Sequence, residues 1–137
     1  MPIDPAEPRY RLGVPEMDET HREFAEIVNQ LTKTDKAGFI ELFPVLVAHT
    51  QAHFDSENAL MKASGFPAVR EHLDEHRRVL GELRRMVVKV ENGSVALARA
   101  YVREQLPAWF SLHAATMDSA LAGHLKQRGA PLAVPPR

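Results

Sequence analysis

Four long segments repeat apolar residues with the period of an α-helix, and this pattern constrains the fold more than any other feature. The segments cover residues 18–33, 37–63, 68–91 and 95–126. Turn residues separate them at positions 34–35, 65–67 and 92–94. Short connections between long helices favour antiparallel neighbours, so the sequence predicts an all-α, antiparallel up-down-up-down four-helix bundle.

Prolines limit the helical region at both ends. They occur at positions 2, 5, 8 and 15, so residues 1–16 are expected to form an extended N-terminal arm. Residues 127–137, QRGAPLAVPPR, cannot continue a helix and are expected to form a C-terminal tail. A chain of 137 residues is long enough for one core, so we expect a single domain over 1–137 with its bundle at 17–126.

Two further prolines fall inside the predicted helices. Pro44 lies early in the second segment and Pro107 lies inside the fourth. Each removes a backbone donor and crowds the preceding turn. We therefore expect a kink or a local restart at both positions, with the helix continuing beyond it.

Composition excludes several classes of partner and ligand. With 17 basic and 18 acidic residues, the chain offers no electrostatic case for nucleic acid or an anionic membrane. It has no apolar run of about 18 residues and no secretory signal, which favours a soluble, cytoplasmic protein. The chain contains no cysteine, so any metal must be held by nitrogen and oxygen.

Every predicted helix places at least one histidine on its apolar face. Burying imidazole or carboxylate groups without partners costs several kcal/mol each. One such histidine is commonly a hydrogen-bonded core residue, but five of them with a carboxylate in one small bundle predict a shared metal centre. The candidates on these faces are His21, His53, Glu57, His72, His76 and His113, with His49 one turn before His53.

Spacing supports this interpretation. His53 with Glu57, and His72 with His76, are one helical turn apart, so each pair projects from one face about 6 Å apart and can chelate one site. His113 and Asp118 are five residues apart. For both to reach one centre, we expect either a local π-type widening of the helix or two adjacent ions.

The donor set restricts the metal and the number of ions. Imidazole and carboxylate without thiolate suit iron, manganese, copper, nickel or zinc. Seven side chains exceed what one octahedral ion can take when both oxygens of each carboxylate are counted. The sequence therefore predicts a dinuclear site in which Glu57 and Asp118 each span both ions.

The order of the motifs MDETH, HFDSENALM, HLDEH and WFSLHAATMD across residues 10–121 resembles the hemerythrins, particularly the bacterial single-domain proteins. The resemblance implies a non-haem di-iron centre with an oxo or hydroxo bridge that binds O2 reversibly. It implies that one iron is coordinatively full, that the other has a vacancy and that two carboxylates bridge them. The ligands of the full iron correspond to His72, His76 and His113, and those of the iron with a vacancy to His21 and His53. The bridging carboxylates correspond to Glu57 and Asp118.

Two octahedral irons have about twelve coordination positions between them. The seven side chains and the bridging oxygen fill all of these except one, where O2 would bind. Phe24, Trp109 and Phe110 are expected to form a dry wall around it, with ordinary core packing as the alternative for each. The chain departs from the usual family pattern at Asn58, where a second Glu is common. Leu121 and Tyr10 stand where the bacterial proteins often have another aromatic residue and a Trp, which leaves O2 affinity and autoxidation rate open.

Two histidines remain outside the motif. His49 is interpreted as a core residue or a hydrogen-bonding neighbour of the site, with a role as a ligand in an altered site as the less favoured alternative. His124 lies near the end of the fourth segment, where a cation suits the helix dipole, and it is expected to face solvent.

Three functions remain open at this stage. The leading hypothesis is O2 binding without catalytic turnover, as an oxygen transport, storage or sensor protein whose protein partner the sequence does not name. A di-iron enzyme that reduces peroxide or nitric oxide would need a proton donor near the vacancy, and only Ser111 and Thr116 are candidates. Iron handling would need an exchangeable site, which seven ligands disfavour.

Overall fold

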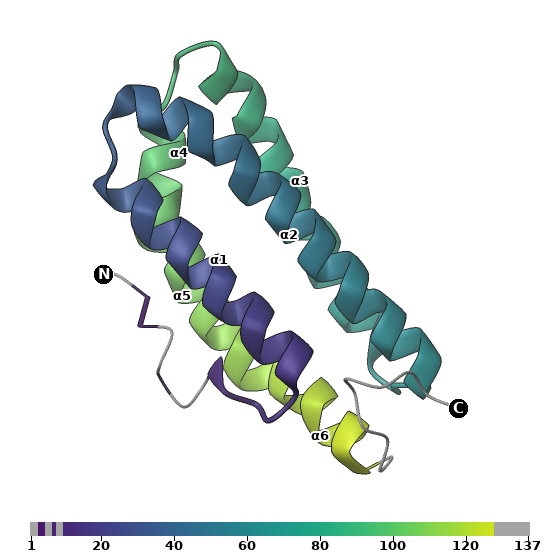
Figure 1. Ribbon diagram of the computed structural model, residues 1–137. Helices are drawn as coiled ribbons and strands as arrows, with labels where there is room; N and C mark the ends of the chain where they lie inside the picture. The colour runs from purple at the N-terminus through teal and green to yellow at the C-terminus, as the bar shows by residue number, and fades with distance from the viewer. Residues whose placement is uncertain (1–2, 5–6, 8–9, 128–137) are drawn as a thin grey trace.

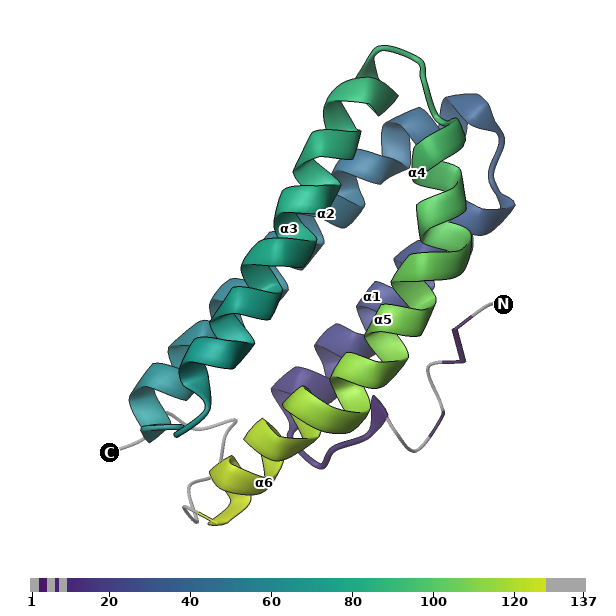
Figure 2. The same cartoon turned by 180° about the vertical axis from the view of Figure 1, so that it is seen from behind.

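A computed structural model describes residues 3–4, 7 and 10–127 of the chain. It confirms an all-α four-helix bundle, and the described residues contain no strand. Figures 1 and 2 show the connections after the first and third helices at one end of the bundle, and the connection after the second at the other. Within the described ranges, every helix is too short or too polar to span a bilayer.

Three uninterrupted helices and one composite helical run form the four walls. The first three walls are α1 (Pro15–Lys33), α2 (Lys36–Ser64) and α3 (Val69–Glu91). The fourth wall consists of α4 (Ala96–Ala100), η2 (Tyr101–Gln105), α5 (Leu106–His113), η3 (Ala114–Asp118) and α6 (Ser119–Gln127).

The predicted boundaries are wrong at the two ends of the helical region. The first helix begins at Pro15 because proline at a helix start lacks only an N–H that the helix does not use there. Gln127 belongs to α6 and not to the expected tail. Residues 128–137 of that tail, and residues 1–2, 5–6 and 8–9 of the arm, lie outside the described residues.

Local signals fix the ends of α2. The carboxylate of Asp35 accepts the backbone N–H of Gly38 at 2.8 Å, which satisfies one of the free donors of the first turn. The helix ends at Gly65, whose φ of 65° lies in the left-handed region that glycine adopts without a steric penalty.

The two internal prolines have different effects. The helix α2 continues through Pro44, and its first turns bend away from the direction of the rest (Figure 1). Before Pro107 the hydrogen bonding changes, because the N–H of Leu106 donates to the C=O of Tyr101, five residues back. The local restart expected near Pro107 is therefore confirmed, as a π-helical segment followed by α5.

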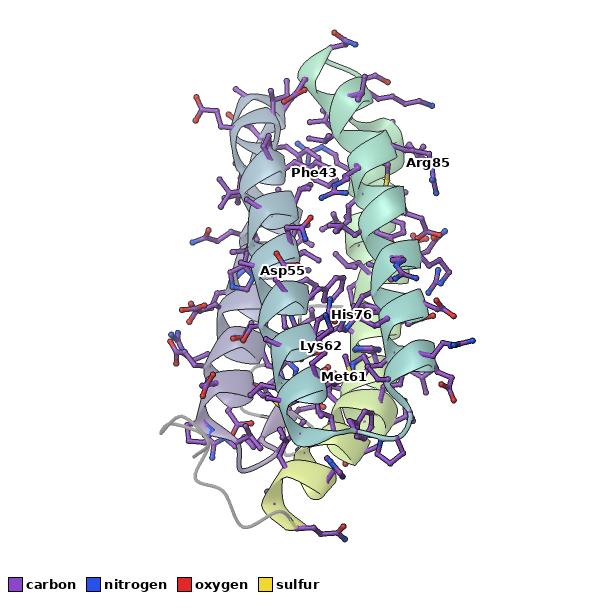
Figure 3. The ribbon with its side chains drawn as sticks, turned by 90° about the vertical axis from the view of Figure 1, so that its right-hand side faces the viewer. Phe43, Asp55, Met61, Lys62, His76 and Arg85 are labelled. Atoms are coloured by element: carbon purple, nitrogen blue, oxygen red, sulfur yellow. The ribbon has the colours of Figure 1, made fainter. Side chains whose placement is uncertain are left out.

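A layer of buried polar groups separates two apolar clusters along the bundle. The larger cluster includes Phe43 and Phe54, and the smaller one includes Met17 and Met61. Figure 3 shows Phe43, His76 and Met61 at successive levels of the bundle. The buried histidines and carboxylates therefore lie together at one level, enclosed by apolar packing on both sides.

The described part of the N-terminal region packs against the bundle. The N–H and C=O of Ile3 both bond the side chain of Asn29, at 2.8 and 2.6 Å. The carboxylate of Asp18 accepts the N–H groups of Leu12 and Gly13 at 2.7 and 3.1 Å. These contacts hold the described part of the chain before α1 against the side of α1.

Candidate metal centre

All seven predicted ligands are buried at the level of the polar layer. Each is at most 4% exposed, and together they come from all four walls of the bundle. They are His21 from α1, His53 and Glu57 from α2, His72 and His76 from α3, His113 from α5 and Asp118 from η3. Such a concentration of ionisable groups is unusual in a core and favours a shared metal ion as their partner.

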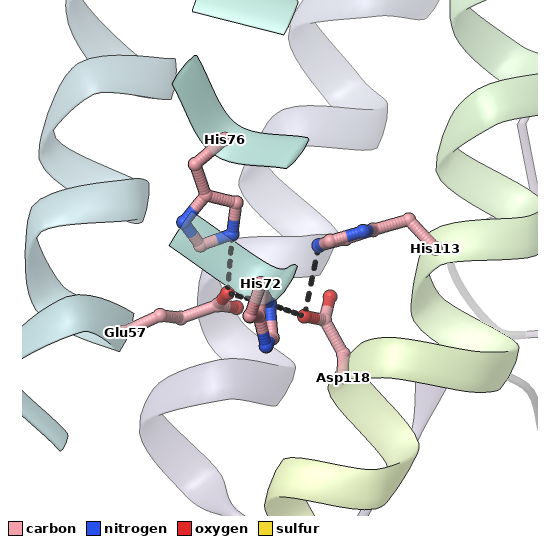
Figure 4. A group of neighbouring side chains, drawn as sticks. All are labelled: Glu57, His72, His76, His113 and Asp118. Atoms are coloured by element: carbon pink, nitrogen blue, oxygen red, sulfur yellow. Dashed lines mark hydrogen bonds and ion pairs between the residues drawn. The ribbon is translucent and has the colours of Figure 1, made fainter. Parts of the chain in front are cut away.

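Three histidines and two carboxylates form the first donor group, which Figure 4 shows. One ligand atom from each of the five residues lies within 4.8 Å of all the others. The Nε2 of His76 is 3.1 Å from Oε1 of Glu57, and that of His113 is 3.1 Å from Oδ1 of Asp118. The Nε2 of His72 is 3.3 and 3.1 Å from the same two oxygens.

Two histidines and the same two carboxylates form the second donor group. The Nε2 of His53 is 2.8 Å from Oε2 of Glu57, and that of His21 is 2.9 Å from Oδ2 of Asp118. Ligand atoms of these four residues also lie within 4.8 Å of one another. Each carboxylate thus turns one oxygen to the three-histidine group and the other oxygen to the two-histidine group.

Several ligand atoms in the first group lie close together without forming hydrogen bonds. The Nε2 atoms of His76 and His113 and the Oε1 of Glu57 are buried and have no hydrogen bond of acceptable geometry within the described residues. They nevertheless lie 3.1–3.3 Å from oppositely charged or polar neighbours. Lone-pair donors that converge at contact distance in this way fit a cation placed between them.

Both carboxylates are ionised. Burial raises the pKa of Glu57 and so does the charge of Asp118, but the contacts with His53 and His72 outweigh both and hold this pKa well below its usual range. Burial also raises the pKa of Asp118, and its close contacts with His113, His21 and His72 lower it by more. The centre therefore holds two buried anions, which suits divalent or trivalent ions.

The histidines differ in how firmly they hold a proton. Burial lowers the pKa of His72, but its hydrogen bond to Asp118 and its close contact with Glu57 outweigh this effect and raise the pKa to about 9. The pKa of His21 is raised for the same reasons, against the effect of burial. Burial lowers the pKa of His76. A metal ion bound here must displace a proton from His72.

A π-helical turn brings the last two ligands together. The segment η3 covers Ala114–Asp118, and the N–H of Ser119 donates to the C=O of Ala114, five residues back. This confirms the predicted widening of the helix. In the widened turn, residues five apart lie on one face, so His113 and Asp118 both reach the centre.

Two ligand histidines have a neutral acceptor behind them. The Nδ1 of His21 lies 3.4 Å from the C=O of Tyr10, and the Nδ1 of His76 lies 3.0 Å from Oδ1 of Asn58. Such partners fix the tautomer and orientation of a metal-binding ring. Sequence reasoning assigned neither role, because both contacts join segments that are distant along the chain.

Phe24 and Phe110 lie beside the two-histidine group. The ring of Phe110 is 5.3 Å from that of His21, and the ring of Phe24 is 6.4 Å from that of His53. The two phenylalanine rings are 4.6 Å apart, and Tyr10 stacks on Phe110 at 4.7 Å. This side of the centre is therefore enclosed by aromatic carbon.

Trp109, predicted for the same wall, lies beside the other donor group. Its ring stacks on His113 of the three-histidine group, with centroids 4.6 Å apart. Its indole N–H donates to Glu75 at 2.7 Å, which turns the polar edge of the ring outward. Position 109 lies one helical turn before His113. The side chain of Trp109 therefore packs beside that histidine and not on the opposite side of the centre.

The two remaining histidines lie outside both donor groups. The Nε2 of His49 is 3.1 Å from a carboxylate oxygen of Glu23, and neither residue belongs to either group. His124 is half-buried, contrary to the expectation that it faces solvent, and its Nε2 bonds the C=O of Ser64 at 2.9 Å. The last turn of α2 leaves free carbonyls, and α6 packs close enough to supply a donor.

Comparisons with known proteins agree with this geometry. Residues 12–125 match the family model described as the hemerythrin HHE cation binding domain. A bacteriohemerythrin from Ralstonia nicotianae is 35% identical over 129 residues, which cover 94% of this chain and 93% of the relative. A bacteriohemerythrin from Stenotrophomonas maltophilia is 25% identical over 119 residues, which cover 84% and 76%. No solved structure matches the chain. The match over nearly the whole length shows that this chain belongs to the hemerythrin family.

Proposed function

We propose that the chain binds O2 reversibly at a non-haem di-iron centre with an oxo or hydroxo bridge. The observation that carries the proposal is the sharing of Glu57 and Asp118 between the two donor groups, with one oxygen of each carboxylate on each side. This is the arrangement that two bridged ions require and that a single ion does not.

The two groups would hold unequal ions. His72, His76 and His113 would bind one iron, and His21 and His53 the other, with both carboxylates as bridges. The two-histidine iron has one protein donor fewer, so it would carry the open position. Bound iron would supply the electrons and the coordination site that O2 needs.

The surroundings of the two-histidine group favour binding over turnover. Phe24, Phe110 and Tyr10 cover this side with apolar rings, which exclude the water and protons that an enzyme reducing peroxide or nitric oxide must admit. The hydroxyl of Thr116 donates to the C=O of Leu112 within its own helix, and its residue is exposed, so it is not placed as a proton donor.

The test is anaerobic addition of ferrous iron to the metal-free protein, followed by cycles of O2 and inert gas. We expect two bound iron atoms per chain and a visible absorption change that appears with O2 and reverses when O2 is removed. The variant Glu57→Gln should bind less iron and lose the change. Glu23→Gln is the control, because Glu23 is half-exposed and lies outside both groups.

Two outcomes would overturn the proposal. Binding of a single ion per chain would contradict the shared carboxylates. Continuous consumption of O2 or peroxide by the wild-type protein would instead indicate an enzyme.

A further inference from the structure

The carboxamide of Asn58 lies directly behind His76. An amide oxygen can only accept a hydrogen bond, so the contact with Asn58 places the ring proton of His76 on Nδ1 and leaves the lone pair on Nε2, which lies 3.1 Å from Oε1 of Glu57. Nδ1–H then donates to Oδ1 of Asn58 at 3.0 Å. The acceptor behind this ligand is therefore an uncharged amide.

Packing leaves His76 little freedom apart from this bond. Its ring stacks on the buried ring of Phe54, with centroids 3.9 Å apart and an angle of 4° between the planes. Stacking fixes the plane of the imidazole ring. It does not decide which of the two ring nitrogens points toward the centre. The hydrogen bond to Asn58 makes that choice, because it holds Nδ1 on the outer side and Nε2 toward Glu57.

Asn58 also borders the exterior. It lines a surface pocket between α2 and α3 together with His76, Gln51, Arg77 and Arg84. A charged group at position 58 would therefore border a surface pocket that two arginines also line. The site can accept a carboxylate there without burying an unpaired charge.

We propose that Asn58 is a positioning residue for His76 and that its neutral acceptor keeps the reduction potential of the three-histidine iron high. This inference rests on the proposed di-iron function. A carboxylate acceptor draws the Nδ1 proton away and makes the imidazole a stronger electron donor, which stabilises ferric iron. An amide oxygen does this less, so the ferrous state that binds O2 is favoured.

The test compares Asn58→Asp with Asn58→Ala. Asn58→Asp has the same shape, so it should retain iron affinity, lower the reduction potential and accelerate autoxidation. Asn58→Ala removes the acceptor and should lower ferrous iron affinity about 10- to 100-fold. Gln51→Glu is the matched control, because it adds the same charge to the same pocket, where the side chain of Gln51 bonds Asp55 and Arg84 and not His76.

A second measurement does not depend on iron or O2. In the zinc-loaded protein, the Nδ1 proton of His76 should give a downfield NMR signal protected from exchange in the wild type and in Asn58→Asp. Asn58→Ala should lose this protection. Circular dichroism of each variant checks that the helical fold is retained.

The outcomes separate this inference from the proposed function. If the wild type binds two irons and O2 but its His76 proton is unprotected, or if Asn58→Asp leaves the potential unchanged, the inference is wrong and the function stands. An equal decrease of the potential in Gln51→Glu would also overturn it, because a general field effect would then suffice. If the wild type does not bind two irons, the proposed function itself is wrong.

Discussion

Asp118 lies five residues after His113, and yet its Oδ1 is 3.1 Å from the Nε2 of that histidine. A regular α-helix would point these two side chains in different directions. The π-helical turn of η3 brings them to one face. In the proposed centre, the fourth wall would thus supply a terminal ligand and a bridging ligand from adjacent turns.

The first prediction concerns the bridging role of Asp118. Asp118→Asn keeps the shape of the side chain but removes the anion that faces His21, His72 and His113. We expect fewer than two iron atoms per chain after anaerobic loading, measured by metal analysis. The exposed Asp74→Asn serves as the control and should bind iron as the wild type does. Full iron content in Asp118→Asn would contradict the assignment.

The second prediction concerns the contact of the N-terminal region with the centre. Asp18 holds the N–H groups of Leu12 and Gly13, just after Tyr10, which stacks on Phe110. Hydrogen bonds to a charged group contribute about 1.5–3 kcal/mol, so Asp18→Ala should lower the free energy of unfolding by about that amount. It should also accelerate autoxidation, because water gains access to the two-histidine side.

The neighbouring Glu16→Ala provides the comparison for Asp18→Ala. Glu16 is exposed and lies in the same first turn of α1. Chemical unfolding and the rate of autoxidation should both stay close to wild-type values. Equal effects of the two substitutions would mean that Asp18 acts only through the first turn of the helix.

The third prediction separates the pocket wall from the general core. Phe110→Ala and Phe43→Ala each remove a fully buried ring from the same apolar cluster, and each should cost about 3–5 kcal/mol of stability. Only Phe110 contacts His21. Autoxidation, followed by the loss of the O2-dependent absorption, should therefore accelerate in Phe110→Ala alone. Acceleration in both variants would indicate that loosening of the bundle is the cause.

The fourth prediction concerns pH. The pKa of His72 rises from 6.5 to about 9 in the folded chain. In the metal-free protein this pairing stabilises the fold fully below pH 6.5, and the contribution is lost as pH rises through about 9. Metal must displace the same proton, so metal affinity should rise over this interval.

Two pH titrations on the same protein check that fold stability and metal affinity change in opposite directions. Chemical unfolding of the metal-free chain should show stability falling between pH 6.5 and about 9. Chelator-buffered zinc, used as a redox-inert probe, should bind more tightly across the same range. A zinc affinity that does not change with pH would show that His72 is not a ligand that must lose a proton.

The sequence predicted the bundle because its apolar residues follow a helical period over four long segments. It also offered the widened turn as one of two ways for His113 and Asp118, five residues apart, to reach the centre, and the structure has this turn. Both inferences depend on positions within a single helix, where the backbone geometry is fixed.

The contacts that sequence reasoning missed join different helices or the N-terminal region to the bundle. The bond from His76 to Asn58, the bond from His21 to Tyr10 and the place of Trp109 all depend on how the walls are rotated against one another. Periodicity places a side chain on a face of its helix, but it does not say which neighbour that face meets.

A crystal structure of the iron-loaded protein tests the central claim most directly. We expect two iron ions per chain, with Glu57 and Asp118 each bound to both ions through different oxygens. One ion, or two ions with each carboxylate bound to only one of them, would contradict it.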